Sequence, residues 1–366
     1  MVYYAVAMAV TLLLSRCNTT LYPLNDSVNA RGFRNGRIAF LVLLPLTLIS
    51  ILRWDVGVDT LYGYTYWDSY QHAANLNNVR DFEIGFFLFS AILSKLGISF
   101  WGYLAINALV FMSCVSYAIS RGSVSTTWSI LVFFLLFVFF DSFNTLRQTL
   151  AESISMIAWA IMGHEQNSLK KDIKILAIFV LASTFHVLAL INIPIYLICK
   201  WRFNRHNLLR FAAVAVLATP VLQLALSAIM QLVAGDEYTF IGFALINAVM
   251  SGVFFLLCWY FYDNICALGT NAYTYVNLAL CIFIVILNSG ALFLPFRVFD
   301  MLKVAYLFII PYLLRSLVKP GVRVCVQCII LAILAAWFIN AFFFQDSVYV
   351  PYQTIFDNLF AIVFLS

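Results

Sequence analysis

Long apolar runs recur from one end of this chain to the other, and they restrict the environment in which it can fold. The chain has 366 residues, of which 64% are hydrophobic and only 10% are charged. Water-soluble domains carry roughly 25% charged residues. The longest polar intervals, residues 16–37 and 53–82, are too short to bury a core of their own. The sequence therefore predicts an all-α polytopic membrane protein, with residues 1–366 forming a single integral-membrane domain.

The lengths of the apolar runs predict how often the chain crosses the membrane. A spanning helix needs about 20 apolar residues, and about ten segments are candidates on this basis. These segments are 1–16, 37–53, 99–120, 124–141, 146–162, 208–234, 238–262, 272–290, 297–318 and 323–344. Three other apolar segments are too short or too awkward to cross, so we expect short re-entrant or broken helices near 83–97, 172–200 and 355–366.

The basic residues orient these spans, because loops rich in Lys and Arg stay in the cytoplasm. Arg16, Arg31, Arg34 and Arg37 place the first loop inside, so the N-terminus is expected outside. The net charge of +5 is explained by this topology rather than by nucleic-acid binding. The predicted outer-side segments are 54–82, 141–146, 186, 234–238, 290–297 and 345–354.

Two basic loops in the middle of the chain conflict with a simple crossing. Residues 163–174 and 200–210 both carry several Lys or Arg, yet one apolar stretch lies between them. Both loops are cytoplasmic only if that stretch turns back, so we expect two short helices, roughly 172–185 and 187–200. The turn near Phe185 and His186 then reaches the outer side, where protein or a watery cavity must cover it.

This topology gathers unusual polar groups at the outer face. The group includes Arg53, Asp59, Tyr62, Tyr64, Tyr66, Glu83, Asn144, Arg147, Gln148, His186, Arg297 and Tyr352. Ionisable groups at membrane depth are costly and usually face a cavity or a partner. Arginines beside helix N-termini suit an anionic ligand such as a lipid pyrophosphate, and tyrosines offer flat faces to sugar rings.

Each of these residues also has a structural interpretation. A single Arg at a helix end can extend to lipid headgroups, and His186 can be a hydrogen-bonded structural residue. The tyrosines can form an ordinary aromatic belt at the membrane interface. The argument for a site is that these residues converge. No metal-binding motif, P-loop or GxSxG motif is found in the sequence.

Five segments in order resemble the EpsG-like, Wzy-type polysaccharide polymerases. The loop RWDVGVDTLYGY resembles the family's R-x-x-x-G-x-D-x-x-x-Y pattern, although Tyr62 and Tyr64 are alternative matches for its tyrosine. The other four segments are EIGFFLFSAILSKLG, FNTLRQTLAESI, LASTFHVLALINIPIY, and LPFRVFDMLKVAY with the later VPYQTIF. The resemblance covers residues 53 to 354.

The resemblance implies a membrane glycosyltransferase of the bacterial cytoplasmic membrane. It would join undecaprenyl-pyrophosphate-linked repeat units on the outer face, building an O-antigen, a capsule or an exopolysaccharide. No cofactor, metal or nucleotide sugar would be required. The expected partners are the lipid-linked donor and acceptor and membrane lipids, together with a chain-length regulator and a flippase.

A mechanism for such a transfer suggests roles for individual residues. Arg147 and Arg297 would stabilise the pyrophosphate leaving group, with Arg53 as a third cation. The catalytic base would be Asp59, Glu83 or His186, and an acidic residue of the first outer loop is favoured. Substrate contacts are expected from Tyr62, Tyr64, Gln148 and Tyr352. Two alternatives remain: an acyltransferase that modifies the same glycans, and a flippase for lipid-linked sugars.

Overall fold

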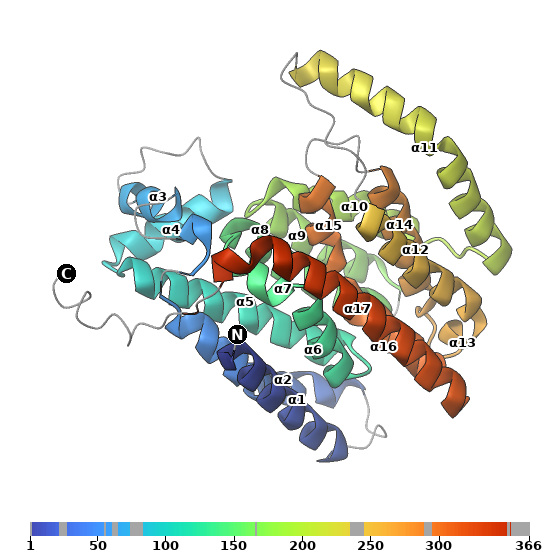
Figure 1. Cartoon of the computed structure of the whole chain (residues 1–366), viewed down its shortest axis with the longest axis horizontal. Helices are drawn as coiled ribbons and strands as arrows, with labels where there is room; N and C mark the ends of the chain where they lie inside the picture. Colours follow the sequence, from blue (N-terminus) through green and yellow to red (C-terminus); the bar gives the residue numbers. More distant parts are fainter. Residues whose placement is uncertain are drawn as a thin grey trace.

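The chain folds into a bundle of helices of unequal length (Figure 1). The computed structural model describes residues 2–21, 28–54, 56–60, 65–73, 83–164, 167–234, 245–288, 295–349 and 352. The elements in chain order are α1 (Val2–Leu21), α2 (Val28–Leu52), the 3₁₀ turn η1 (Val58–Thr60), α3 (Thr65–Ala73), α4 (Ile84–Lys95), α5 (Phe100–Gly122), α6 (Thr126–Leu135), α7 (Val138–Asp141), α8 (Leu146–His164), α9 (Leu169–Ser183), the 3₁₀ turn η2 (Val187–Ile191), α10 (Asn192–Cys199), α11 (Arg205–Ala234), α12 (Leu245–Tyr260), α13 (Tyr262–Cys266), α14 (Tyr273–Asn288), α15 (Pro295–Lys303), α16 (Tyr306–Ser316) and α17 (Pro320–Tyr349). No strand occurs in these residues, so the all-α prediction is confirmed.

The core of the bundle is built around α8, α14 and α16, whose side chains are buried on nearly every face. Helix α5 packs against α2 on one side and α8 on the other, and α12 packs against α14. Helix α11 lies along one edge of the bundle, far from α1 and α2 (Figure 1). A helix that is apolar all round is found inside a large protein or in a membrane, which fits the nearly continuous apolar sequence of α16.

The outer surface of the bundle is itself apolar. Large hydrophobic side chains are exposed on α1, α11 and α17 in particular, and Leu217 of α11 remains 80% exposed. Soluble monomers rarely expose contiguous apolar surface of this extent. Within the described residues, two helices are both long and apolar enough to cross a bilayer alone, Phe100–Gly122 and Pro320–Phe342. This surface is that of a membrane protein.

The two short-helix predictions inside the described residues are confirmed as helices. Helix α4 has 12 residues and covers most of the expected 83–97 segment. The 172–200 stretch is broken as expected, because α9 ends at Ser183 and the chain turns before η2 and α10. The predicted short helix at 355–366 lies outside the described residues.

Two predicted spans are interrupted, which corrects the expectation of continuous helices there. The 124–141 segment is two helices, because buried Phe137 adopts a left-handed conformation with φ of 64° between α6 and α7. The 297–318 segment divides into α15 and α16 at residues 304–305. Neither break contains glycine or proline, so the sequence carried no local signal for them.

Candidate functional site

The outer loop that contains Gly57 and Asp59 is held against the turn that joins α7 to α8. Gly57 has φ of +96°, and a Cβ at this position would lie 2.2 Å from the carbonyl oxygen of Phe143. The Thr60 hydroxyl donates to the same carbonyl at 2.9 Å. The backbone N–H of Asp59 donates to Asn144 Oδ1, also at 2.9 Å. Only glycine fits this close approach and this backbone angle, which explains the glycine in RWDVGVD.

Arg53 strengthens the same contact from inside the protein. Its side chain is buried, Nη1 donates to the carbonyl oxygen of Ser142 at 3.1 Å, and the guanidinium lies 4.9 Å from the centre of the Phe143 ring. These contacts make Arg53 part of the support beneath the loop. Its expected role as a third cation for a ligand therefore stays a prediction.

Glu83 and Arg147 form an ion pair between the start of α4 and the start of α8. Arg147 Nη1 donates to Glu83 Oε2 at 2.8 Å, and the backbone N–H of Val187 donates to Glu83 Oε1 at 3.1 Å. Burial alone would raise the pKa of Glu83. Hydrogen bonds from its own backbone N–H and that of Val187, with the Arg147 charge, hold this pKa below its ordinary value. Glu83 is therefore an ionised carboxylate whose two oxygens are both occupied.

A glycine allows α4 to approach the turn that contains His186. The backbone N–H of Gly85 donates to the carbonyl oxygen of Thr184 at 2.8 Å. A Cβ on Gly85 would lie 2.3 Å from Thr184 Oγ1. The E-x-G motif therefore has a structural explanation: the glutamate contacts α8 and η2, and the glycine provides room for the turn after α9.

His186 is neutral in this environment. Burial, together with the charges of Arg147 and Arg297, lowers the pKa of His186 to about 4 against the opposing effect of Glu83. The ring Nδ1 accepts a hydrogen bond from the backbone N–H of Leu188 at 3.3 Å. A neutral imidazole that accepts at Nδ1 carries its proton on Nε2. His186 is thus set up to donate a hydrogen bond from Nε2.

Asp59 and Arg297 carry the charged groups that the fold leaves available. Within the described part of the chain, neither side chain makes a hydrogen bond or an ion pair. Burial raises the pKa of the Asp59 carboxyl above its ordinary value, and the charges of Arg297 and Arg147 oppose that rise. The charges of both arginines act on Asp59 and on His186, so these four residues lie near one another and form the candidate site.

Other predicted site residues lie behind or beside this cluster. Gln148 is buried, and its Nε2 donates to Glu152 Oε1 at 2.9 Å and to the carbonyl oxygen of Arg297 at 3.3 Å. Tyr352 packs on Tyr4 of α1 and donates to the carbonyl oxygen of Ile49 at 2.6 Å. Tyr62 and Tyr64 lie outside the described residues. Their predicted contacts with substrate, and those of Gln148 and Tyr352, stay predictions.

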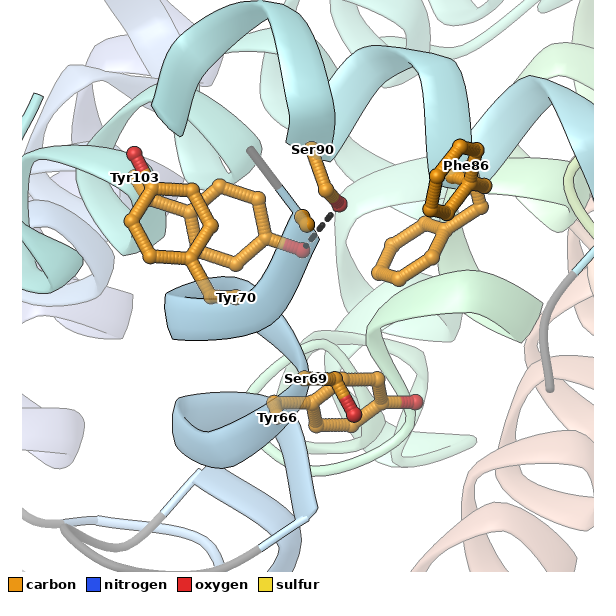
Figure 2. Close-up of a pocket in the computed structure, with 8 residues that line it drawn as sticks. Tyr66, Ser69, Tyr70, Phe86, Ser90 and Tyr103 are labelled. Carbon is orange, nitrogen blue, oxygen red and sulfur yellow. Dashed lines mark hydrogen bonds between the residues drawn. The ribbon is translucent and has the colours of Figure 1, made fainter. Parts of the chain in front are cut away.

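A small aromatic pocket adjoins the charged cluster between α3, α4 and α5 (Figure 2). Its lining includes Tyr66, Tyr70, Phe86, Ser90 and Tyr103. The Tyr70 and Tyr103 rings stack 4.3 Å apart, and Tyr103 shares a 3.1 Å hydrogen bond with Ser90 (Figure 2). Tyr66 links this pocket to the site, because its hydroxyl accepts a hydrogen bond from the Arg147 side chain.

The site is built where several helices begin. Glu83 precedes α4, Arg147 is the second residue of α8, His186 precedes η2, and Arg297 is the third residue of α15. The first N–H groups of a helix lack partners within it and carry a partial positive charge. Arginines and helix N-termini together favour an anion such as a phosphate group. In the described residues, no group of three His, Cys, Asp or Glu side chains is arranged to hold a metal ion.

The fold defines the class of protein: a helical membrane protein, whose candidate site places two arginines at helix N-termini at one end of the bundle. The EpsG family model matches residues 37–354 of the 366-residue chain. The chain therefore belongs to the EpsG family, which places it among the membrane proteins of polysaccharide biosynthesis. The match confirms the resemblance found in the sequence. No curated protein and no solved structure matches the chain.

Proposed function

We propose that this protein is a polysaccharide polymerase that joins lipid-pyrophosphate-linked repeat units by glycosyl transfer. The observation that carries the proposal is the site itself: two arginines at helix N-termini act on one available carboxylate and one neutral histidine. Membership of the EpsG family supports the same activity. The substrates would be a growing glycan on undecaprenyl pyrophosphate and a second lipid-linked unit.

The arginines would act on the leaving group. Negative charge grows on the pyrophosphate as the glycosidic bond breaks, so fixed cations there stabilise the transition state more than the bound substrate. Arg297 is exposed at the start of α15, and Arg147 lies at the start of α8. The Nε2–H of His186 would donate a further hydrogen bond to a phosphate or sugar oxygen, which a neutral imidazole can do at any pH above its low pKa.

Asp59 is the best-placed base of the three that the sequence left open. Glu83 has both carboxylate oxygens occupied and a lowered pKa, which makes it a weak base. His186 already uses Nδ1 as an acceptor and holds its proton on Nε2. Asp59 combines a raised pKa with a position beside both arginines. A raised pKa brings a carboxylate closer to the range in which a general base is effective.

The proposed reaction exchanges one bond for another. The acceptor hydroxyl oxygen attacks the anomeric carbon of the donor glycan, and its proton passes to the Asp59 carboxylate. The bond from the anomeric carbon to the pyrophosphate oxygen breaks, and its electron pair leaves with undecaprenyl pyrophosphate. The glycan grows by one repeat unit. Holding donor and acceptor together in one site would supply much of the remaining rate.

The proposal includes the topology inferred from the charged loops. The protein would lie in the bacterial cytoplasmic membrane with about ten crossings. Its N-terminus and the site would face outward, where lipid-linked units arrive from a flippase and where a chain-length regulator would act. A reporter fused after residue 165 would then read as cytoplasmic. A periplasmic reading would overturn the hairpin formed by α9, η2 and α10.

The length distribution of the surface glycan in a deletion strain tests the activity. A polymerase defect leaves single repeat units on the lipid carrier or its final acceptor, and the wild-type gene restores the long chains. An acyltransferase defect would leave chain length intact and change only acyl content. A flippase defect would accumulate lipid-linked units on the inner leaflet. Long chains of normal length in the deletion strain would overturn the proposal.

A further inference from the structure

A buried lysine with several acidic neighbours lies beneath the proposed site. Lys303, in the last turn of α15, is 1% exposed. Its Nζ donates to Asp141 Oδ2, at the end of α7, and at 2.7 Å to Asp300 Oδ1 in the preceding turn of α15. Glu152 on α8 is a third acidic neighbour that interacts with it electrostatically. A buried charge of this kind is costly unless it is paired and hydrogen-bonded, so Lys303 holds α7 and α15 together.

The network reaches Arg297 by two routes. Arg297 and Lys303 belong to the same nine-residue helix, so fixing its end also fixes its beginning. Glu152 accepts a hydrogen bond from Gln148, whose amide also donates to the carbonyl oxygen of Arg297. Side chains from α7 and α8 therefore hold α15 at both ends.

The same network is continuous with the support of Asp59. Asp141 ends α7, and Asn144, three residues later, accepts from the backbone N–H of Asp59. One short turn thus binds Lys303 through Asp141 and Asp59 through Asn144. A shift of α15 against this turn would change the position of Arg297 relative to Asp59.

We infer that Lys303, bonded to Asp141 and Asp300, is a positioning residue that sets Arg297 at the pyrophosphate-binding end of the site. This inference rests on the proposed function, because it assumes that Arg297 binds a lipid pyrophosphate. Lys303 itself is buried and acts through Arg297.

The test measures binding of undecaprenyl pyrophosphate to the full-length protein, purified in detergent. Lys303→Arg keeps the charge but replaces a compact ammonium with a planar fork that does not fit the same acceptors. We expect Lys303→Arg and Arg297→Ala each to weaken binding by about tenfold or more, the scale of one charge-assisted hydrogen bond. In the Lys303→Arg and Arg297→Ala double variant, binding should be no weaker than in Arg297→Ala alone.

Lys171→Arg is the matched control. Lys171 is equally withdrawn from solvent at 3% exposure, and its Nζ donates to the carbonyl oxygen of Met162 and to Asn167 Oδ1. Met162 is about 22 Å along α8 from Arg147, at 1.5 Å per residue. Lys171→Arg should lower the melting temperature to a similar extent and leave undecaprenyl pyrophosphate binding unchanged.

The outcomes distinguish the positioning role of Lys303 from the proposed binding of pyrophosphate by Arg297. Wild-type binding by Lys303→Arg, or additive losses in the double variant, would overturn the positioning role while leaving the proposed function intact. Unchanged binding by Arg297→Ala would instead remove the pyrophosphate site, and the positioning role with it. If Lys303→Arg does not fold, Asp300→Asn replaces it, because that variant keeps the bond from Lys303 to Asp141.

Discussion

The two ends of the helix bundle are both rich in charge, but they use it differently. At the end where α9 begins and α10 ends, Asp172 accepts from Lys200 and from Tyr196, and Lys171 donates to two acceptors. Arg205 lies 4.8 Å from the Trp259 ring centre. At the other end, the carboxylate of Asp59 and the guanidinium of Arg297 have no hydrogen-bond or ion-pair partner among the described residues.

This difference separates charges that stabilise the fold from charges that are available to a ligand. Ion pairs such as Lys200 with Asp172 neutralise one another, and the bundle needs them because unpaired charge near a bilayer is costly. The other end also holds an ion pair, Glu83 with Arg147, but Asp59 and Arg297 there have no such partner among the described residues. The number of polar residues alone therefore does not distinguish the two ends. Charged side chains without a hydrogen-bond or ion-pair partner point to the candidate site. The predictions below test this distinction.

The largest effect is expected from Arg147→Ala. The substitution removes a cation from the leaving group and also releases Glu83 and Tyr66, which Arg147 holds. We expect polymer formation to fall roughly a thousandfold, the upper scale for loss of one fixed transition-state donor. Complementation of the deletion strain, read as glycan chain length, measures this. Arg202→Ala at the opposite end, whose guanidinium lies over Tyr273, is the control and should restore normal chains.

Asp59→Asn should cost about a hundredfold in rate if Asp59 is the general base. A base must be deprotonated, so activity should rise with pH through the Asp59 pKa, which burial raises above the ordinary aspartate value. The acid limb of the wild-type profile should therefore lie at higher pH than for a solvated aspartate. Asp68→Asn, which changes an exposed carboxylate on the neighbouring helix α3, should leave the profile unchanged. An Asp59→Asn variant with wild-type rate would remove Asp59 from the mechanism.

His186→Gln should reduce the rate by about tenfold, the value of one hydrogen bond to charge. With its pKa near 4, His186 is neutral from about pH 5 to 8 and should add no limb to the activity profile there. The unfolded state takes up a proton near pH 6.5, so this residue should make unfolding easier as pH falls from there toward 4. His72→Gln is the exposed control. A histidine-dependent limb near pH 6.5 would contradict the neutral state.

Gly85→Ala should lower stability by about 1–3 kcal/mol, because the added Cβ would meet Thr184. Thermal unfolding in detergent measures the change. Gly269→Ala is the control, since a Cβ there meets nothing within 4 Å. Equal melting temperatures for the two variants would mean that α4 does not pack closely on the turn after α9.

Tyr352→Phe should have the smallest effect, about 1 kcal/mol of stability for the lost hydrogen bond to Ile49. If the residue only joins α1 and α2, the substrate KM should stay unchanged. A raised KM at an unchanged melting temperature would instead support the substrate contact that the sequence predicts.

The sequence predicted the parts of this molecule that follow from charge and apolar length. The helical hairpin at 172–200 came from two basic loops that had to share a side, and the gathering of Glu83, Arg147, His186 and Arg297 followed from it. The breaks at Phe137 and residues 304–305 were not predictable, because tertiary packing alone imposes them.

The sequence also could not distinguish charges that support the site from charges that face a ligand. Arg53 and Arg147 both lie at helix ends, yet only the structure shows that Arg53 is buried against Ser142 and Phe143. The Lys303 network was missed because its members come from α7, α8 and α15. Its local signals were two pairs one turn apart, Gln148 with Glu152 on α8 and Asp300 with Lys303 on α15.

The convergence of helix N-termini has a consequence for how the protein responds to an acidic medium. At the outer face proposed for this site, the local pH follows the surroundings of the cell. Arginine stays protonated and backbone N–H groups do not titrate, so the capacity to hold an anion persists as the medium acidifies. Among the described site residues, Asp59 is the carboxylate whose pKa burial raises, so it loses its charge as the medium acidifies. Acid should therefore stop chain growth while leaving the carrier lipid bound, a block that is reversed when the medium is neutralised.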